Sequence, residues 1–257
     1  MLYAAPIWGF LEYDQPEKLF RFYMKKILCL PNNTPNYALY LESHFRTQFS
    51  FAITLHFNYI LKVLNFPSHR LLNILAHETI RNNISWYKEW NKLLTRIGLQ
   101  EIVNPTDQRL KDMLYTAVNC LDKYKWDNFC MSARSSLFHD EYCNLDYKNT
   151  SYINDNMPTK SISVIFKART GLLNINARAF KDNILGLCTL CNLDATENTY
   201  HFIGTCPILK NFRYQFFGVS ILTIRKLHKI LNTSSKNLAN YITSALNYCD
   251  LILNEFY

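Results

Sequence analysis

The sequence predicts an all-α fold. Six of its 257 residues are glycine, and long stretches contain neither Gly nor Pro, whereas a β fold needs frequent turn residues. Apolar residues recur at helical spacing along most of the chain. A hydrophobic content of 49% is that of a globular protein with ample material for a core. These observations together indicate helices packed around one large core or two modest ones.

The first 136 residues are expected to form one domain of successive helices. Glu17 to Cys29 carries an apolar stripe opposite Lys18, Arg21 and Lys25, and Pro31 ends it. Thr34 followed by Pro35 has the pattern of a helix start, with a capping hydroxyl and a proline at the first helical position. The further helices expected in this domain cover residues 37–42, 45–64, 70–80, 84–96, 106–123 and 126–133.

The chain changes character after residue 136. Residues 137–157 are rich in Asn, Asp, Tyr and Ser without a sustained period, so we expect a polar linker or loop there. Pro158 then opens a new helix that ends near Gly171, and two more helices are expected between Ile221 and Tyr257. This divides the chain into a helical domain (1–136), a linker (137–157) and a C-terminal segment (158–257).

The C-terminal segment carries all of the excess positive charge. Residues 158–236 contain eleven Lys/Arg and three Asp/Glu, a net charge of +8, whereas the rest of the chain contains seventeen of each sign. Such a segment suits a polyanion, most simply nucleic acid; the alternative is a solvated basic face without a partner. The 38 aromatic residues either stack on bases or, as large aromatics usually do, make core contacts.

Cysteine usage indicates an intracellular, reducing location. Five of the eight cysteines have irregular spacing and are expected to be mostly small buried hydrophobes rather than a disulfide scaffold: Cys29, Cys120, Cys130, Cys143 and Cys249. The first ten residues lack the charged leader and cleavage site of a signal peptide. No stretch of about 18 apolar residues could span a bilayer, so no membrane partner is expected.

The remaining cysteines form the most informative motif of the chain. Cys188, Cys191, His201 and Cys206 have the spacing C-x2-C-x9-H-x4-C. Three thiolates and one imidazole complete a tetrahedral Zn²⁺ site and leave no position open for a substrate, so we expect a structural zinc ion. A redox CxxC pair would not explain the His and the third Cys. Coincidence of buried cysteines is the other alternative.

The residues between these ligands predict how they are presented. Asp194 and Glu197 resemble a capping arrangement that opens a short helix carrying His201, and Gly204 is expected to end it in a left-handed conformation. The chain must turn there, because residues five apart on an α-helix lie about 140° apart. Glu197 lies one helical turn before His201 and is expected to orient its imidazole. Pro207 would then start a helix over residues 208–217.

The motif and its surroundings resemble the C-terminal region of reverse transcriptases from non-LTR (LINE-type, Jockey-like) insect retrotransposons. Tyr3–Gly9 resembles the block that follows the catalytic palm of that family. The segments Leu28–Pro31, Thr34–Tyr37 and Leu41–Glu42 resemble its thumb, Lys167–Gly171 and Asn176–Arg178 resemble the stretch before its zinc knuckle, and Cys188–Cys206 with Pro207 and Arg213 resembles the knuckle itself.

The resemblance implies a thumb-like helical bundle, a small zinc-stapled helical subdomain and a binding role without catalysis. The family's polymerase uses a palm Asp-Asp pair with two metal ions, and this sequence contains no Asp-Asp. Paired carboxylates, a Gly-rich phosphate loop and a nucleophile motif are also missing, so no small-molecule substrate is expected. We therefore expect a truncated part of a transposon polyprotein, with Met1 an internal methionine, rather than an enzyme.

The partners implied are RNA or DNA, bound through the backbone with weak sequence preference, and the missing palm. The implied thumb contacts are Lys18, Arg21 and Lys25, and the implied phosphate contacts near the zinc are Lys167, Arg169, Arg178, Lys181, Lys210 and Arg213. In the alternative, the zinc only stabilises the helical fold and the protein is a structural or protein-interaction module.

Overall fold

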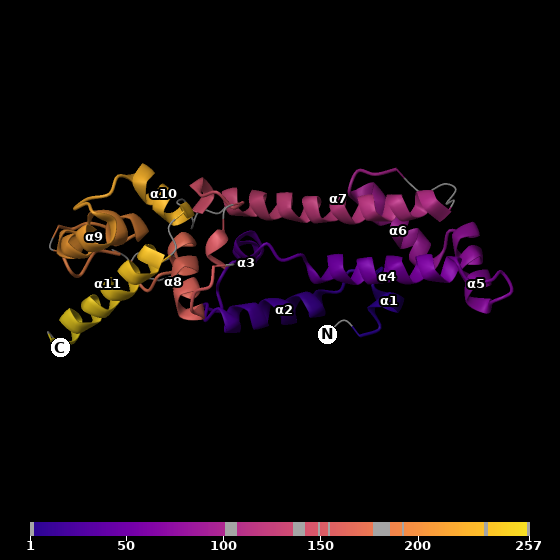
Figure 1. Ribbon diagram of the computed structural model, residues 1–257, viewed down its shortest axis with the longest axis horizontal. Helices are drawn as coiled ribbons and strands as arrows, with labels where there is room; N and C mark the ends of the chain where they lie inside the picture. Colours follow the sequence, from indigo (N-terminus) through magenta and orange to yellow (C-terminus); the bar gives the residue numbers. More distant parts are fainter. Residues whose placement is uncertain are drawn as a thin grey trace. The chain divides into compact units, whose positions relative to one another are not determined.

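The prediction of an all-α fold is confirmed. A computed structural model describes residues 3–100, 107–135, 142–148, 150–153, 155–176, 186–191, 193–233 and 236–255. Within these ranges the regular structure is helical, apart from one isolated antiparallel bridge between Leu187 and Thr196 (Figure 1). None of the helices in the described part of the chain has the length and apolarity needed to cross a bilayer.

The chain folds into two compact units, which are not the segments expected from the sequence. One unit comprises residues 1–22 and 45–129, and the other comprises residues 23–44 and 130–257. The N-terminal unit contains α1 (Ala5–Trp8), α4 (Gln48–Leu64), α5 (Leu71–Arg81) and α6 (Ser85–Arg96). The C-terminal unit contains α3 (Asn36–Ser43), α8 (Thr159–Arg169), α9 (Lys210–Phe217), α10 (Ile224–Thr233) and α11 (Lys236–Glu255). Two helices, α2 (Asp14–Ile27) and α7 (Asp107–Arg134), have residues in both units.

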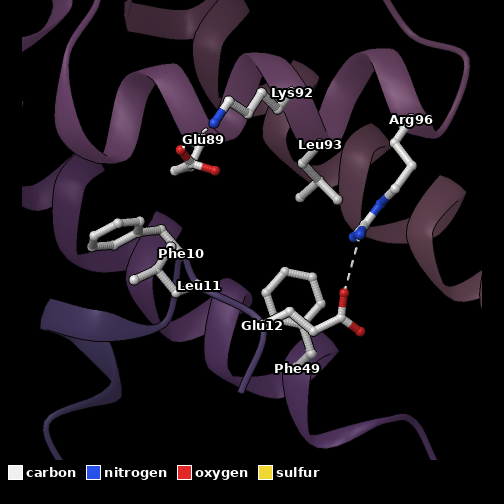
Figure 2. Close-up of a pocket in the computed structure, with 8 residues that line it drawn as sticks. All are labelled: Phe10, Leu11, Glu12, Phe49, Glu89, Lys92, Leu93 and Arg96. Carbon is white, nitrogen blue, oxygen red and sulfur yellow. Dashed lines mark hydrogen bonds and ion pairs between the residues drawn. The ribbon is translucent and has the colours of Figure 1, made fainter. Parts of the chain in front are cut away.

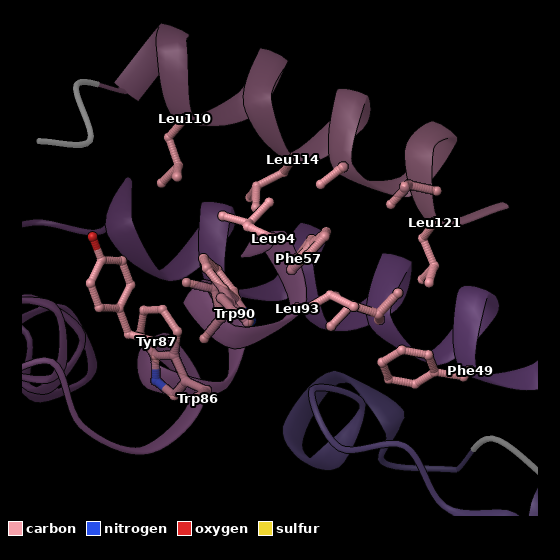
Figure 3. Close-up of a cluster of buried hydrophobic side chains, with 14 of the residues drawn as sticks. Phe49, Phe57, Trp86, Tyr87, Trp90, Leu93, Leu94, Leu110, Leu114 and Leu121 are labelled. Atoms are coloured by element: carbon pink, nitrogen blue, oxygen red, sulfur yellow. The ribbon is translucent and has the colours of Figure 1, made fainter. Parts of the chain in front are cut away.

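An aromatic cluster forms the core of the N-terminal unit. Trp90 of α6 is 1% exposed, and its ring meets the edge of Phe57 from α4 at a centroid distance of 4.8 Å. Leu110, Leu114 and Leu121 of α7 point into the same cluster, as Figure 3 shows. Their spacing of four and seven residues places them on one face of the helix. The aromatics of this cluster are therefore core contacts, whereas others, such as Tyr3 and Tyr214, are exposed.

Helix α1 packs closely against α4 in the same unit. The buried Gly9 lies so near α4 that a Cβ atom there would be 2.2 Å from the Ala52 carbonyl oxygen, so only glycine fits. His56 of α4 forms a 2.7 Å hydrogen bond through Nδ1 to the Pro6 carbonyl. Burial lowers the pKa of this histidine to about 4, against the smaller opposing influence of that bond, so the imidazole is neutral.

Helix α7 is a single helix of 28 residues, whereas we expected two helices separated near residue 124. The residues at the expected break, Tyr124 and Lys125, are compatible with a helix, and Lys125 pairs with Glu12 of the same unit. Side-chain contacts thus stabilise α7 at residues 124 and 125, where the apolar period in the sequence is interrupted. The break expected at residues 105–107 falls partly outside the described residues.

A buried ion pair ties segments of the C-terminal unit that are far apart in the sequence. Arg169 of α8 donates from Nε to Glu42 of α3 at 2.7 Å, and both side chains are 0% exposed. The Tyr152 hydroxyl also donates to Glu42. Tyr142, Tyr147 and Tyr152 are buried, so the described part of the expected polar linker contributes core side chains to this unit.

Candidate metal centre

The structure brings the four predicted ligands together in the C-terminal unit. One ligand atom from each of Cys188, Cys191, His201 and Cys206 lies within 4.8 Å of every other, and all four residues are buried. The Cys191 thiol lies 3.3 Å from His201 Nε2, and the Cys188 and Cys206 sulfurs are 4.0 Å apart. Three thiols and one imidazole in this arrangement could hold a metal ion such as zinc.

A short hairpin-like turn presents the first two ligands. The Cys188 amide donates to the Ala195 carbonyl at 2.8 Å, and the Glu197 amide donates to the Gly186 carbonyl at the same distance. The isolated bridge between Leu187 and Thr196 lies between these two bonds. The CxxC sequence therefore lies at the closed end of a turn, where two thiols can face one point.

A π-helical turn presents the other two ligands. It covers His201–Thr205, and the Cys206 amide donates to the His201 carbonyl at 2.8 Å, a bond between residues five apart. On an α-helix these two residues would lie about 140° apart, so the wider turn is what brings both toward the same side. The sequence predicted that the chain must turn here, but not that a π-turn would do it.

Asn198 caps this turn, rather than the expected Asp194 and Glu197. The Asn198 side-chain oxygen accepts from the His201 amide at 2.8 Å. Gly204 lies inside the turn and not at a left-handed end, and a Cβ there would lie 3.0 Å from the Tyr200 ring. Close packing, and not backbone conformation, therefore favours glycine at this position.

The imidazole of His201 is oriented by Thr205 rather than by Glu197. The Thr205 hydroxyl lies 3.3 Å from His201 Nδ1, which leaves Nε2 to face the thiols. The Glu197 carboxylate instead accepts from the Asn176 amide at 2.8 Å through Oε2, and its Oε1 lies 3.7 Å from the Cys188 sulfur. Glu197 therefore supports the turn that carries Cys188.

Burial favours the neutral forms of Cys188, His201 and Cys206. Burial raises the pKa of the Cys188 thiol to about 12 and also raises the pKa of the Cys206 thiol. Burial lowers the pKa of His201; the Glu197 carboxylate opposes this shift and the Arg213 charge adds to it. Neutral imidazole is the form that binds a metal. The thiols, in contrast, would have to lose their protons to solvent before they could bind one.

Arg213 is an internal residue of this site and not a surface cation. Its side chain is 0% exposed, and it donates to the Cys206 carbonyl at 2.6 Å and to the Ser220 carbonyl at 2.7 Å. It therefore places a positive charge beside the last ligand of the cluster, where bound thiolates would be negative. The sequence suggested a phosphate contact because helical period alone does not reveal that the Arg213 side of α9 is buried, whereas Lys210 and Tyr214 of the same helix are exposed.

The other residues expected to contact nucleic acid, both the phosphate contacts and the thumb contacts, have different environments. Arg169 is buried in its ion pair with Glu42, so like Arg213 it is not accessible to a phosphate. Lys210 and Lys18 are exposed, and Lys18 pairs with Asp14 at 3.3 Å. Lys167, Arg21 and Lys25 are partly buried, and Lys25 donates to the Asn32 carbonyl. Arg178 and Lys181 lie outside the described residues.

A surface hollow of about 200 Å³ in the N-terminal unit offers no comparable ligand set. Figure 2 shows its lining, formed by Phe10, Leu11, Glu12, Phe49, Glu89, Lys92, Leu93 and Arg96. Its charged groups are already paired, with Glu12 3.1 Å from Arg96 and Glu89 2.7 Å from Lys92. Charges paired in this way are typical of a surface ion-pair group rather than of a reaction centre.

Four of the remaining cysteines have side chains that the structure describes, and none of these four forms a disulfide. Cys249 is buried, Cys120 and Cys130 are half-buried, and Cys29 is exposed, so fewer of them are buried than expected. The Cys143 side chain lies outside the described part of the chain.

Comparisons with protein-family models, with curated proteins and with solved structures find no match for this chain. The resemblance to retrotransposon reverse transcriptases therefore stays a prediction from the motifs.

Proposed function

We propose that this protein is a non-catalytic nucleic-acid-binding module in which a structural zinc ion holds the C-terminal unit in its folded form. The observation that carries the proposal is the buried cluster of Cys188, Cys191, His201 and Cys206, in which four ligands of the types zinc prefers converge. Four protein ligands leave no coordination position for a substrate, so the ion would stabilise the fold rather than act on a reactant.

The surroundings of the cluster support a structural role. The CxxC turn and the π-turn bring ligands from two segments to one point, so an ion bound to all four would tie these segments together. Structural zinc supplies about 10–16 kcal/mol of apparent binding free energy in zinc-finger peptides near neutral pH, which there becomes folding free energy. Arg213 would offset part of the negative charge of three thiolates.

Nucleic acid as the partner is supported by the charge of the sequence and by its resemblance to the thumb and knuckle of the retrotransposon enzymes. The net charge of +8 lies in residues 158–236, the segment that contains the four residues of the cluster. Binding through phosphates would neutralise several of these charges and release counterions, so the affinity would fall steeply with salt. This proposal includes no catalytic step.

A second candidate, a protein-interaction module, is favoured by one surface. Helix α2 exposes four large apolar side chains at 43–61% relative exposure: Leu19, Phe22, Tyr23 and Ile27. Exposed large apolar side chains of this kind are typical of a helix that contacts another protein. In this candidate the zinc only stabilises the fold, and binding to a partner would be largely insensitive to salt.

Metal content and salt-dependent binding test the proposal. Purified protein should contain a single zinc ion per chain, and Cys206→Ala should lose both the ion and the helical order of the C-terminal unit. Cys249→Ala is the matched control, because Cys249 is also a buried thiol but lies outside the cluster. Folded wild-type protein without zinc would refute the metal site, and zinc-loaded protein without salt-dependent RNA or DNA binding would leave the second candidate.

A further inference from the structure

Helix α10 presents a cationic face. None of the nucleic-acid contacts expected from the sequence lies in this helix. Arg225, Lys226 and Lys229 are exposed, whereas Leu227 and Leu231 on the other side are 0% and 3% exposed. At 100° per residue the three cations fall within an arc of about 100°, on the side away from these leucines. The helix contains no Asp or Glu.

These three cations are not engaged by acidic side chains. No ion pair or hydrogen bond of their side chains occurs among the residues that the structure describes. Asp146 contacts α10 at the opposite end of the helix, where its backbone amide donates to Asn232. Its carboxylate accepts from the Lys148 amide. The cationic face is therefore available to an external anion.

The fold holds α10 in place at both ends. Before the helix, the Leu222 amide donates to the Gly204 carbonyl at 3.0 Å, and the Tyr200 hydroxyl donates to the Leu222 carbonyl at 3.1 Å. At its C-terminal end, Arg169 donates from Nη1 to the Leu231 carbonyl. Helix α10 also contacts the π-turn that carries His201. A face held in this way loses little conformational entropy when it binds a ligand.

Of the two buried arginines, Arg169 holds the C-terminal end of α10 and Arg213 holds the segment that precedes the helix. Arg213 donates to the carbonyl of Ser220, two residues before Leu222, and Arg169 donates to Leu231. Because the π-turn lies between the metal cluster and the start of α10, loss of the metal is expected to loosen this helix too.

The geometry points to the cationic face of α10, formed by Arg225, Lys226 and Lys229, as the surface that binds nucleic-acid phosphates. This inference rests on the proposed function and identifies the surface that would bind the nucleic acid. A lipid surface fits less well, since a helix that lies on a bilayer needs a free apolar face, and Leu227 and Leu231 are already buried in the protein. Phosphodiester oxygens need only exposed cations held in a fixed arrangement.

The test compares a variant that lacks the three cations of α10 with a control variant that loses the same number of positive charges in the N-terminal unit. The variant carries Arg225→Gln, Lys226→Gln and Lys229→Gln. The control carries Lys62→Gln, Lys88→Gln and Lys111→Gln, three exposed lysines of the N-terminal unit. Binding of zinc-loaded protein to a single-stranded RNA and to a DNA duplex is followed by fluorescence anisotropy between about 50 and 200 mM salt. Circular dichroism and zinc content verify that both variants fold.

We expect the α10 variant to bind at least about tenfold more weakly, and its slope of log K against log salt to fall by about 2 on RNA and about 3 on duplex DNA. The control should keep the wild-type slope. Wild-type slopes in the α10 variant, with wild-type protein still binding, would overturn this inference and leave the proposed function standing. Wild-type protein that binds neither probe would overturn both. Binding to phosphatidylserine vesicles that only the α10 variant loses, without nucleic-acid binding, would identify a lipid surface instead.

Discussion

Replacing Arg169 by methionine separates an internal role from a phosphate contact. Both partners of the pair are fully buried, and the guanidinium donates to Glu42 and to the carbonyls of Leu231 and Asp146. Methionine fills similar space but leaves the Glu42 carboxylate buried without a counter-ion. Removing one partner of a buried pair typically costs about 3–5 kcal/mol, so we expect Arg169→Met to lower the free energy of unfolding by about 4 kcal/mol.

A double-mutant cycle tests the reason for this loss. The double variant Glu42→Met, Arg169→Met removes the uncompensated charge, so it should be more stable than Arg169→Met alone by at least about 1 kcal/mol. Arg225→Met is the matched control, because Arg225 is an exposed arginine of the same unit, and its effect on stability should stay within about 0.5 kcal/mol.

The assay must report on the C-terminal unit. The four tryptophans, Trp8, Trp86, Trp90 and Trp126, all belong to the N-terminal unit, so tryptophan fluorescence would follow the wrong part of the protein. Hydrogen exchange of the α3 and α8 amides, beside urea unfolding followed by circular dichroism, gives the required free energies. An Arg169→Met protein within about 1 kcal/mol of wild type, or one whose only defect is weaker RNA binding, would refute this reasoning.

Three further perturbations have defined outcomes. Gly9→Ala places a Cβ against the Ala52 carbonyl, so urea unfolding should show a loss of about 3 kcal/mol, and an unchanged midpoint would contradict the tight contact of α1 with α4. The pKa of His56 is about 4 in the folded protein and 6.5 ordinarily, so the unfolded chain takes up the proton first as the pH falls. The free energy of unfolding therefore keeps its full value above pH 6.5 and decreases by about 3 kcal/mol as the pH drops to 4. His56→Asn should flatten this dependence of the urea midpoint on pH, and a wild-type profile already flat between these values would refute it. Gly204→Ala pushes a Cβ against the Tyr200 ring and should weaken zinc affinity in a chelator competition, whereas wild-type affinity would show that the π-turn tolerates the methyl group.

The sequence anticipated local features of the metal centre well. Ligand types and spacing within nineteen residues were enough to predict that Cys188, Cys191, His201 and Cys206 converge, because short segments restrict where such side chains can go. The details that failed were those that depend on neighbours: the cap is Asn198, the turn is a π-turn, and Thr205 contacts the imidazole. Each follows from packing around the cluster, which no local pattern specifies.

The sequence also contained a signal for the cationic face that we did not use. Arg225, Lys226 and Lys229 lie in an amphipathic segment without acidic residues, and this pattern is visible without coordinates. Proximity to the zinc motif favoured Arg213 instead. Charge alone did not distinguish a solvated cation from a buried one.

By itself, the sequence determined the all-α class, the positions of most helices and the set of four residues that converge as candidate metal ligands, because these depend on period and spacing along the chain. Only the tertiary structure decided which cations are exposed. Arg169 meets Glu42 across 127 positions of sequence, and Arg213 turns inward to the carbonyls of Cys206 and Ser220. An arginine becomes buried when distant segments supply acceptors that replace its hydration, and that supply exists only once the chain has folded.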